Sequence, residues 1–125
     1  MKQIVVAQNA PRPIGPYSQG IRIDNFVFTS GQGPTDPKTN TVVNGSFEDQ
    51  VRQTLNNVRA ILTAAGTDLT RVIKVNVYLS DMNNFAAFNE VYKEYFHGIY
   101  PCRTAIEAKL PAGFSVEVDC IATID

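Results

Sequence analysis

The most regular pattern of hydrophobic and polar residues in the chain runs from Arg71 to Leu79. Apolar residues recur there at every second position, which predicts a β-strand with one face toward a core; they are Ile73, Val75, Val77 and Leu79. The opposite face mixes apolar and polar side chains, namely Val72, Lys74, Asn76 and Tyr78. We expect this segment to be the central strand of a sheet.

Two segments have the spacing of amphipathic helices. The first begins at Ser46, a good N-cap residue, with Asp49 following as part of an imperfect capping box, and Gly66 closes it. Its apolar residues recur at helical intervals: Phe47, Val51, Leu55, Val58 and Leu62. The second follows Ser80-Asp81, stops at Gly98, and carries an aromatic stripe of Phe85, Phe88, Tyr92 and Tyr95. Because such stripes are far more often core than a cofactor site, we assign this one to the core.

The remaining apolar runs predict shorter strands. Asp24-Asn25 is a polar turn between apolar residues and predicts a hairpin, whereas Gly31 to Asn44, with its prolines, predicts a long loop. Arg103 to Ala108 and Phe114 to Ala122 predict a closing pair of strands, joined by Leu110-Pro111-Ala112-Gly113. The order of strands, helix, strand, helix and strands indicates an α+β fold, in which one face of a sheet carries both helices.

The composition limits the classes of protein to consider. The 125 residues, 44% of them hydrophobic, predict a single domain over residues 1–125 with a core of its own. Lys and Arg number 11 against 12 Asp and Glu, and the net charge of -1 without a basic run disfavours nucleic acid and membrane surfaces as partners. The N-terminal apolar run is too short for a signal peptide, and no stretch approaches the roughly 18 residues of a membrane span. These features predict a cytoplasmic protein.

The residues that usually bind metals are sparse. Cys102 and Cys120 are far apart and lack the spacing of a zinc site or a disulfide framework. His97 is the one histidine, and its place before Gly98 favours a role at the end of a helix over catalysis. We therefore expect no metal site from these residues.

The second face of the predicted sheet is only partly polar. In the last strand, Ser115, Glu117, Asp119 and Ile121 share that face, and the central strand is similarly mixed. A half-apolar outer face is commonly covered by another subunit, so we favour a closed homo-oligomer with sites at its interfaces. A sheet with one face in water is the simpler alternative.

Arg103 and Glu117 are the candidates for chemistry. Arg103 stands between a Tyr-Pro-Cys turn and a strand-like run, and a guanidinium offers a planar fork of donors that matches a carboxylate. Glu117 lies in the last strand and is a candidate for handling a proton or a water molecule beside that carboxylate. Taken alone, the pair is more often a structural ion pair between strands.

Several separate motifs, in order along nearly the whole chain, resemble the Rid family, the YjgF-like reactive intermediate deaminases. In the first half they are Ala10-Pro11, Ile14 to Gly20, Phe28 to Gln32, and Gln53 to Val58. In the second half they are Val75 to Leu79, Phe88 to Tyr92, Pro101 to Thr104, Leu110-Pro111, and Val116 to Val118. A set of motifs in one order is much more specific than any one of them.

The resemblance implies a chorismate-mutase-like homotrimer, in which three sheets form an inner barrel and the active-site clefts lie between subunits. Arginine-bearing members of this family hydrolyse reactive enamine and imine intermediates, such as 2-iminopropanoate and 2-iminobutanoate, to 2-oxo acids and ammonia. No cofactor or metal is implied, because a protonated imine is already activated for attack by water.

The resemblance also assigns roles to residues of this chain. Arg103 matches the clamp for the substrate carboxylate, Glu117 matches the glutamate beside the attacking water, and Tyr17 matches a tyrosine that lines the cleft and relays a proton. The predicted binding or shaping residues are Ser30, Gly31, Asn89 and Ala105. Each also has a structural interpretation, since turns and helix surfaces use the same residue types.

The chain departs from the family pattern after Arg103. The family usually has a cysteine two residues after the arginine, where this chain has Ala105, and Cys102 lies before the arginine. Alanine can replace a cysteine that acts through its backbone, whereas any property of the thiol is absent. The segment from Arg103 to Leu110 is also one residue shorter than usual, which predicts a lost bulge or a shifted register.

Two other classes of function stay open on the sequence. A trimeric binding or regulatory module would capture small carboxylates in the same clefts without turnover, and Arg103 would support it equally well. A nucleic-acid role has been described for some family members, as translation inhibitors or ribonucleases. The mild acidity and the absence of a basic patch count against that role in this chain.

Overall fold

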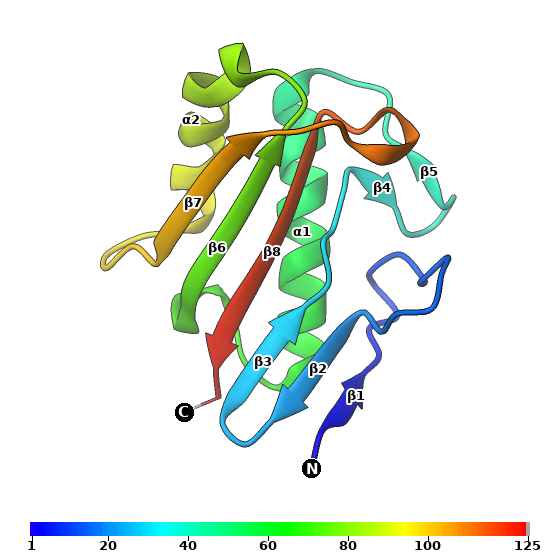
Figure 1. Ribbon diagram of the computed structural model, residues 1–125, viewed down its shortest axis with the longest axis vertical. Coiled ribbons are helices and arrows are strands. Elements are labelled where there is room, and N and C mark those ends of the chain that lie inside the picture. The colour runs from blue at the N-terminus through cyan, green and yellow to red at the C-terminus, as the bar shows by residue number, and fades with distance from the viewer. Residues whose placement is uncertain (125) are drawn as a thin grey trace.

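A mixed β-sheet covered on one face by two helices forms the fold in the computed structural model, which describes residues 1–124 (Figure 1). Within those residues the sheet has six strands in the order β1-β2-β3-β8-β6-β7. Neighbouring strands are antiparallel except β6 and β7, which are parallel. The strands are β1 (Gln3–Val5), β2 (Gly20–Ile23), β3 (Phe26–Thr29), β6 (Val72–Leu79), β7 (Cys102–Glu107) and β8 (Val116–Thr123). The predicted α+β class is confirmed, and the trimer and its inner barrel stay predictions.

The first helix, α1 (Phe47–Ala65), has both of its predicted ends. The Ser46 hydroxyl accepts a hydrogen bond from the Asp49 backbone N–H at 3.1 Å, which caps an otherwise unpaired donor. Gly66 ends the helix in the left-handed region, with a φ of 90° that favours glycine. Leu55, Val58 and Leu62 are fully buried against the sheet, so burial of the predicted apolar stripe stabilises the helix.

The second helix, α2 (Phe85–Tyr95), is shorter than its pattern predicts. A short 3-10 turn, Met82–Asn84, precedes it, and the Asp81 carboxylate accepts from the Asn83 N–H at 2.9 Å. The chain leaves the helix at Phe96, which is extended and buried with its ring stacked on Tyr92 at 4.4 Å. The predicted end at Gly98 was therefore wrong by two residues, because the cap is Phe96 and burying its ring takes the chain out of the helical path.

The prediction that the last two strands pair with each other was wrong. β6 lies between β7 and β8 and pairs with both, in parallel with β7 and antiparallel with β8. The crossover through α2 returns the chain in the direction of β6, as parallel pairing requires. β1 was not predicted, and the predicted loop holds a small ribbon of β4 (Thr35–Asp36) and β5 (Thr41–Val42).

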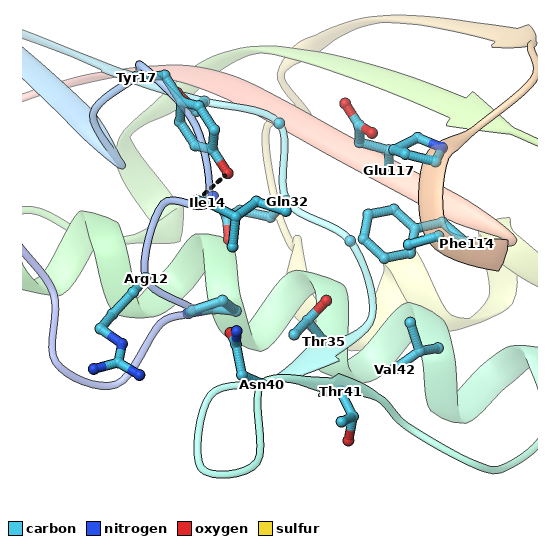
Figure 2. A pocket seen from close by; sticks show the side chains of 16 residues that line it. Arg12, Ile14, Tyr17, Gln32, Thr35, Asn40, Thr41, Val42, Phe114 and Glu117 are labelled. Carbon is cyan, nitrogen blue, oxygen red and sulfur yellow. Dashed lines mark hydrogen bonds between the residues drawn. The ribbon is translucent and has the colours of Figure 1, made fainter.

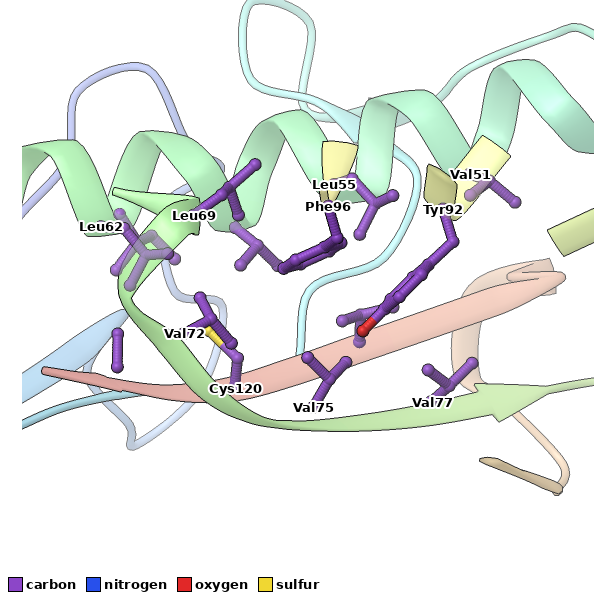
Figure 3. Packing of buried hydrophobic residues seen from close by; sticks show 14 of the residues in the cluster. Val51, Leu55, Leu62, Leu69, Val72, Val75, Val77, Tyr92, Phe96 and Cys120 are labelled. Atoms are coloured by element: carbon purple, nitrogen blue, oxygen red, sulfur yellow. The ribbon is translucent and has the colours of Figure 1, made fainter. Parts of the chain in front are cut away.

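A bulge corrects the predicted face of one residue in β6. The pairing of β6 with β8 shifts between Val72 and Lys74, so the two-residue period breaks there. Ile73, predicted to face the core, is 43% exposed, and Val72 is buried in its place. From Val75 onward the alternation holds, and the core lies between that face of the sheet and the helices (Figure 3).

The core contains a buried hydroxyl without a partner. Tyr92 reaches from α2 toward the sheet (Figure 3), and its hydroxyl has no hydrogen-bond partner within residues 1–124. Burial accordingly raises the pKa of Tyr92 to about 12. We expect Tyr92→Phe to raise the free energy of unfolding by about 1–3 kcal/mol, because it removes an unsatisfied polar group and keeps the ring. Urea unfolding measures this, and a lower midpoint at unchanged slope would contradict it.

No helix in the described residues is long and apolar enough to cross a membrane.

Candidate functional site

The register of the sheet puts Arg103 and Glu117 on opposite faces. Arg103 pairs with Val75, which is fully buried beneath the helices, and paired residues share a face. Glu117 pairs with Tyr78, which alternates with buried Val77 and so lies on the other face. One chain therefore does not bring the two side chains together. The alternative of a structural ion pair is excluded, since no carboxylate within residues 1–124 lies in salt-bridge contact with Arg103.

The Arg103 cavity is a space of about 490 Å³ between β7 and α2. Its lining residues are Ala86, Asn89, Glu90, Tyr92, Lys93, Tyr100, Pro101 and Arg103. The Asn89 side-chain oxygen accepts from Arg103 Nη1 at 2.8 Å, which brings together two of the predicted residues. Arg103 makes no other hydrogen bond to a described residue, so most of its five donors are available to a ligand.

The Glu117 cavity, of about 690 Å³, holds the other predicted residues (Figure 2). Tyr17, Ser30, Gly31 and Glu117 all line it, together with Gln32 and Phe114 among others. Tyr17 comes from the loop before β2, Ser30 and Gly31 follow β3, and Glu117 is on β8. Three separate segments of the chain thus converge on one cavity.

Glu117 is a half-buried carboxylate without a donor. No hydrogen bond from a residue within 1–124 contributes to the environment of its oxygens. Burial raises the pKa of Glu117 above its ordinary value of 4.5, and the Asp119 carboxylate on the same strand face adds to that rise. A carboxylate with a raised pKa and free lone pairs is suited to accept a proton from water.

Glycine at position 31 allows the Glu117 side chain to approach the loop. A Cβ on Gly31 would collide with the Glu117 carboxylate, and one on Gly33 would collide with the Phe114 ring. The role predicted for Gly31 is therefore one of space: it leaves room for the carboxylate at the wall of the cavity.

Ser30 is linked by hydrogen bonds to the turn that carries Tyr17. The Ser30 hydroxyl donates to the Ser18 carbonyl at 2.6 Å, and its N–H donates to the Gln19 carbonyl at 2.9 Å. The Ser30 side chain therefore holds the Tyr17 turn against β3. Tyr17 is 47% exposed, and its hydroxyl accepts only a long 3.4 Å bond from the Ile14 N–H, which leaves the hydroxyl open to the cavity.

Two buried amides that the sequence did not suggest organise the Glu117 cavity. Gln19 donates to the carbonyls of Ala7, Ala10 and Pro11 and accepts from the Ala7 N–H, which fixes the loop before Tyr17. Asn57 on α1 donates to the Gly33 and Thr35 carbonyls at 3.0 and 2.8 Å. The available signal for Asn57 was its place beside the apolar stripe of α1, where a polar residue needs a partner.

Ala105 lies two residues beyond Arg103 on the same face of β7. It packs against the core and is not among the residues that line the Arg103 cavity, so its binding role stays a prediction. The pairing of β6 with β7 is continuous from Cys102 to Glu107. The shorter segment after Arg103 therefore leaves the strand that carries the arginine regular.

The described residues contain no group of three or more His, Cys, Asp and Glu side chains that could hold a metal ion.

The mixed sheet with both helices on one face is the fold of YjgF proteins. The crystal structure of E. coli TdcF with bound serine matches it with a TM-score of 0.92 and 41% identity, over 97% of this chain and 98% of that one. Residues 7–124 match the family model described as Endoribonuclease L-PSP. The chain belongs to this family, which is the Rid or YjgF family that its motifs resemble.

Relatives in the family carry two kinds of name. A RutC family protein of Pyrococcus horikoshii is 54% identical over 98% of this chain and 98% of its own length. A protein of Capra hircus named 2-iminobutanoate/2-iminopropanoate deaminase is 42% identical over 98% of this chain and 90% of its own length. Both names describe those proteins, and the second indicates a chemistry to test here.

Proposed function

We propose that this protein hydrolyses short 2-imino acids, with 2-iminopropanoate and 2-iminobutanoate as its substrates, to 2-oxo acids and ammonia. The observation that carries the proposal is the free guanidinium of Arg103, held by one amide oxygen and paired with no carboxylate in the described residues. An arginine in that state is suited to a planar anion. The relative of Capra hircus that is named for this reaction supports the choice of substrate.

The residues account for each part of the reaction. Arg103 binds the carboxylate beside the imine carbon with two parallel hydrogen bonds and so fixes that carbon. Glu117 orients a water molecule and accepts its proton as the oxygen bonds to the carbon. The tetrahedral adduct then expels its protonated nitrogen as ammonia and leaves a carbonyl. Tyr17 lines the same cavity and relays a proton between the adduct and Glu117.

The reaction needs both cavities, and we propose that they meet across the subunits of a homotrimer. The outer face of the sheet exposes several large apolar side chains, which a neighbouring copy would bury; they include Ile23, Phe26, Phe28 and Ile106. In such an assembly the Arg103 cavity of one subunit faces the Glu117 cavity of the next. The opposite faces of Arg103 and Glu117 within one chain favour this arrangement over a site inside a single subunit.

An assay with imines that are generated in situ tests the proposed function. An amino-acid oxidase generates 2-iminopropanoate or 2-iminobutanoate from the amino acid, and semicarbazide competes for the imine that has not been hydrolysed. We expect the protein to speed the release of the 2-oxo acid and to lower the yield of the direct imine adduct. If well-folded protein has no such effect, the deaminase proposal is wrong, and the alternative is a module that binds small carboxylates without turnover.

A further inference from the structure

The aromatic stripe of α2, assigned to the core on sequence grounds, also surrounds Arg103. The guanidinium carbon of Arg103 lies 4.9 Å from the centre of the Tyr92 ring, 5.4 Å from that of Phe85 and 6.0 Å from that of Phe88. These distances are within the range of cation–π attraction. Three rings of one helix thus contact the cation that β7 contributes.

A carboxylate side chain is a poor partner for positioning an arginine that has to bind an anionic ligand. A carboxylate partner would neutralise the guanidinium and occupy the fork that the ligand needs. Aromatic faces attract the cation while leaving its charge and its donors intact. The rings also exclude water from one side of the group, which strengthens its attraction for an anion on the other side.

Asn89 completes the arrangement by fixing the plane of the guanidinium. It lies on α2 between Phe88 and Tyr92, and its oxygen takes one hydrogen of Nη1. The remaining donors leave an edge free for two parallel bonds to a carboxylate. Because a free arginine side chain loses considerable rotamer entropy when it is ordered, holding it beforehand favours binding.

We propose that Phe85, Phe88 and Tyr92 are positioning residues, which hold the Arg103 guanidinium in a cation–π cage ready for the substrate carboxylate. The proposal rests on the proposed function, since it concerns the clamp of the same site. It gives the stripe a second role beside packing. Phe88 is fully buried and Tyr92 nearly so, whereas Phe85 is only partly buried and can be changed with less effect on the core.

The test compares Phe85→Leu, which keeps an apolar side chain, with Phe85→Tyr, which keeps the ring. The probe is 2-oxobutanoate, a stable carboxylate whose Kd is measured by calorimetry, with KM and kcat measured on the imine. We expect Phe85→Leu to raise Kd and KM by about 3- to 10-fold with a smaller change in kcat, and Phe85→Tyr to stay within about twofold of wild type.

The outcomes separate this proposal from the deaminase itself. Equal Kd values for wild type and Phe85→Leu would overturn the cage even if imine hydrolysis is fast. If the protein binds 2-oxobutanoate but does not hydrolyse imines, the deaminase proposal fails and the Kd values of the variants still test the cage. If wild type does not bind 2-oxobutanoate, the cage proposal is wrong. If Phe85→Leu lowers the unfolding midpoint, Phe85→Met takes its place, because methionine fills a similar volume without a ring.

Discussion

Arg103→Ala is expected to abolish the acceleration of imine hydrolysis while the protein stays folded. In the proposed mechanism Arg103 makes two charge-assisted hydrogen bonds to the substrate carboxylate, so their loss should lower kcat/KM by about 10²- to 10⁴-fold. Arg103 has no ion pair in the described residues and lies on an edge strand, so the variant should stay folded although it loses the contacts of Arg103 with the aromatic rings. The measurement is the semicarbazide competition assay with wild type beside the variant.

Two further variants identify the cause of that loss. Arg103→Lys keeps the charge without the planar fork, and we expect it to recover only a small part of the activity. Arg59→Ala removes another arginine, one that lies on α1 over the Tyr95 ring and lines neither cavity, and it should behave as wild type. If Arg103→Ala retains activity, the protein is still an enzyme, but Arg103 is not the group that binds the substrate carboxylate.

Glu117→Gln is expected to lower kcat by about 10²- to 10⁴-fold, because glutamine cannot accept the proton of the attacking water. The same change should stabilise the fold at neutral pH. Burial raises the pKa of Glu117, so the folded protein favours the protonated acid, which glutamine resembles in shape and charge. A variant that gains stability and loses turnover separates a functional carboxylate from a structural one.

The pH dependence of these two effects has a definite sign. The folded state binds the Glu117 proton more tightly than the unfolded state, so the wild type loses stability as pH rises from the ordinary value of 4.5 through the raised pKa. The stability advantage of Glu117→Gln should therefore be largest near pH 7 and vanish near pH 4. Wild-type activity should fall as pH drops through the raised pKa. A Glu117→Gln protein that is less stable at pH 7 would contradict this account.

The sequence predicted those elements whose pattern has one structural meaning. The apolar residues from Phe47 to Leu62 recur at helical intervals between a serine cap and a terminal glycine, a pattern that is typical of a helix and of no other element. The alternation in β6 identified a strand. The bulge that exposes Ile73 could not be predicted, because the residue types around it are those of a regular strand. The position of β6 between β7 and β8 could not be predicted, because a run of alternating residues does not specify its neighbours.

The candidate site was predicted by residue type and motif more than by geometry. A guanidinium for a carboxylate and a glutamate for a water molecule follow from chemistry, and the family motifs fixed which residues those are. Their opposite faces depend on the register of three strands, which no single segment encodes. The supporting amides of Gln19 and Asn57 act through bonds to distant carbonyls, so only the folded chain reveals them.

The central claim is that each cleft takes Arg103 from one subunit and Glu117 from its neighbour. Arg103→Ala and Glu117→Gln, each inactive alone, are unfolded, mixed in equal amounts and refolded together, and mass spectrometry of differently tagged chains verifies that mixed trimers form. A cleft is active when one subunit supplies an intact Arg103 and its neighbour an intact Glu117. In a random, equal mixture each of these has a chance of about one half, so about one quarter of wild-type activity should return. Mixed trimers without activity would contradict the claim.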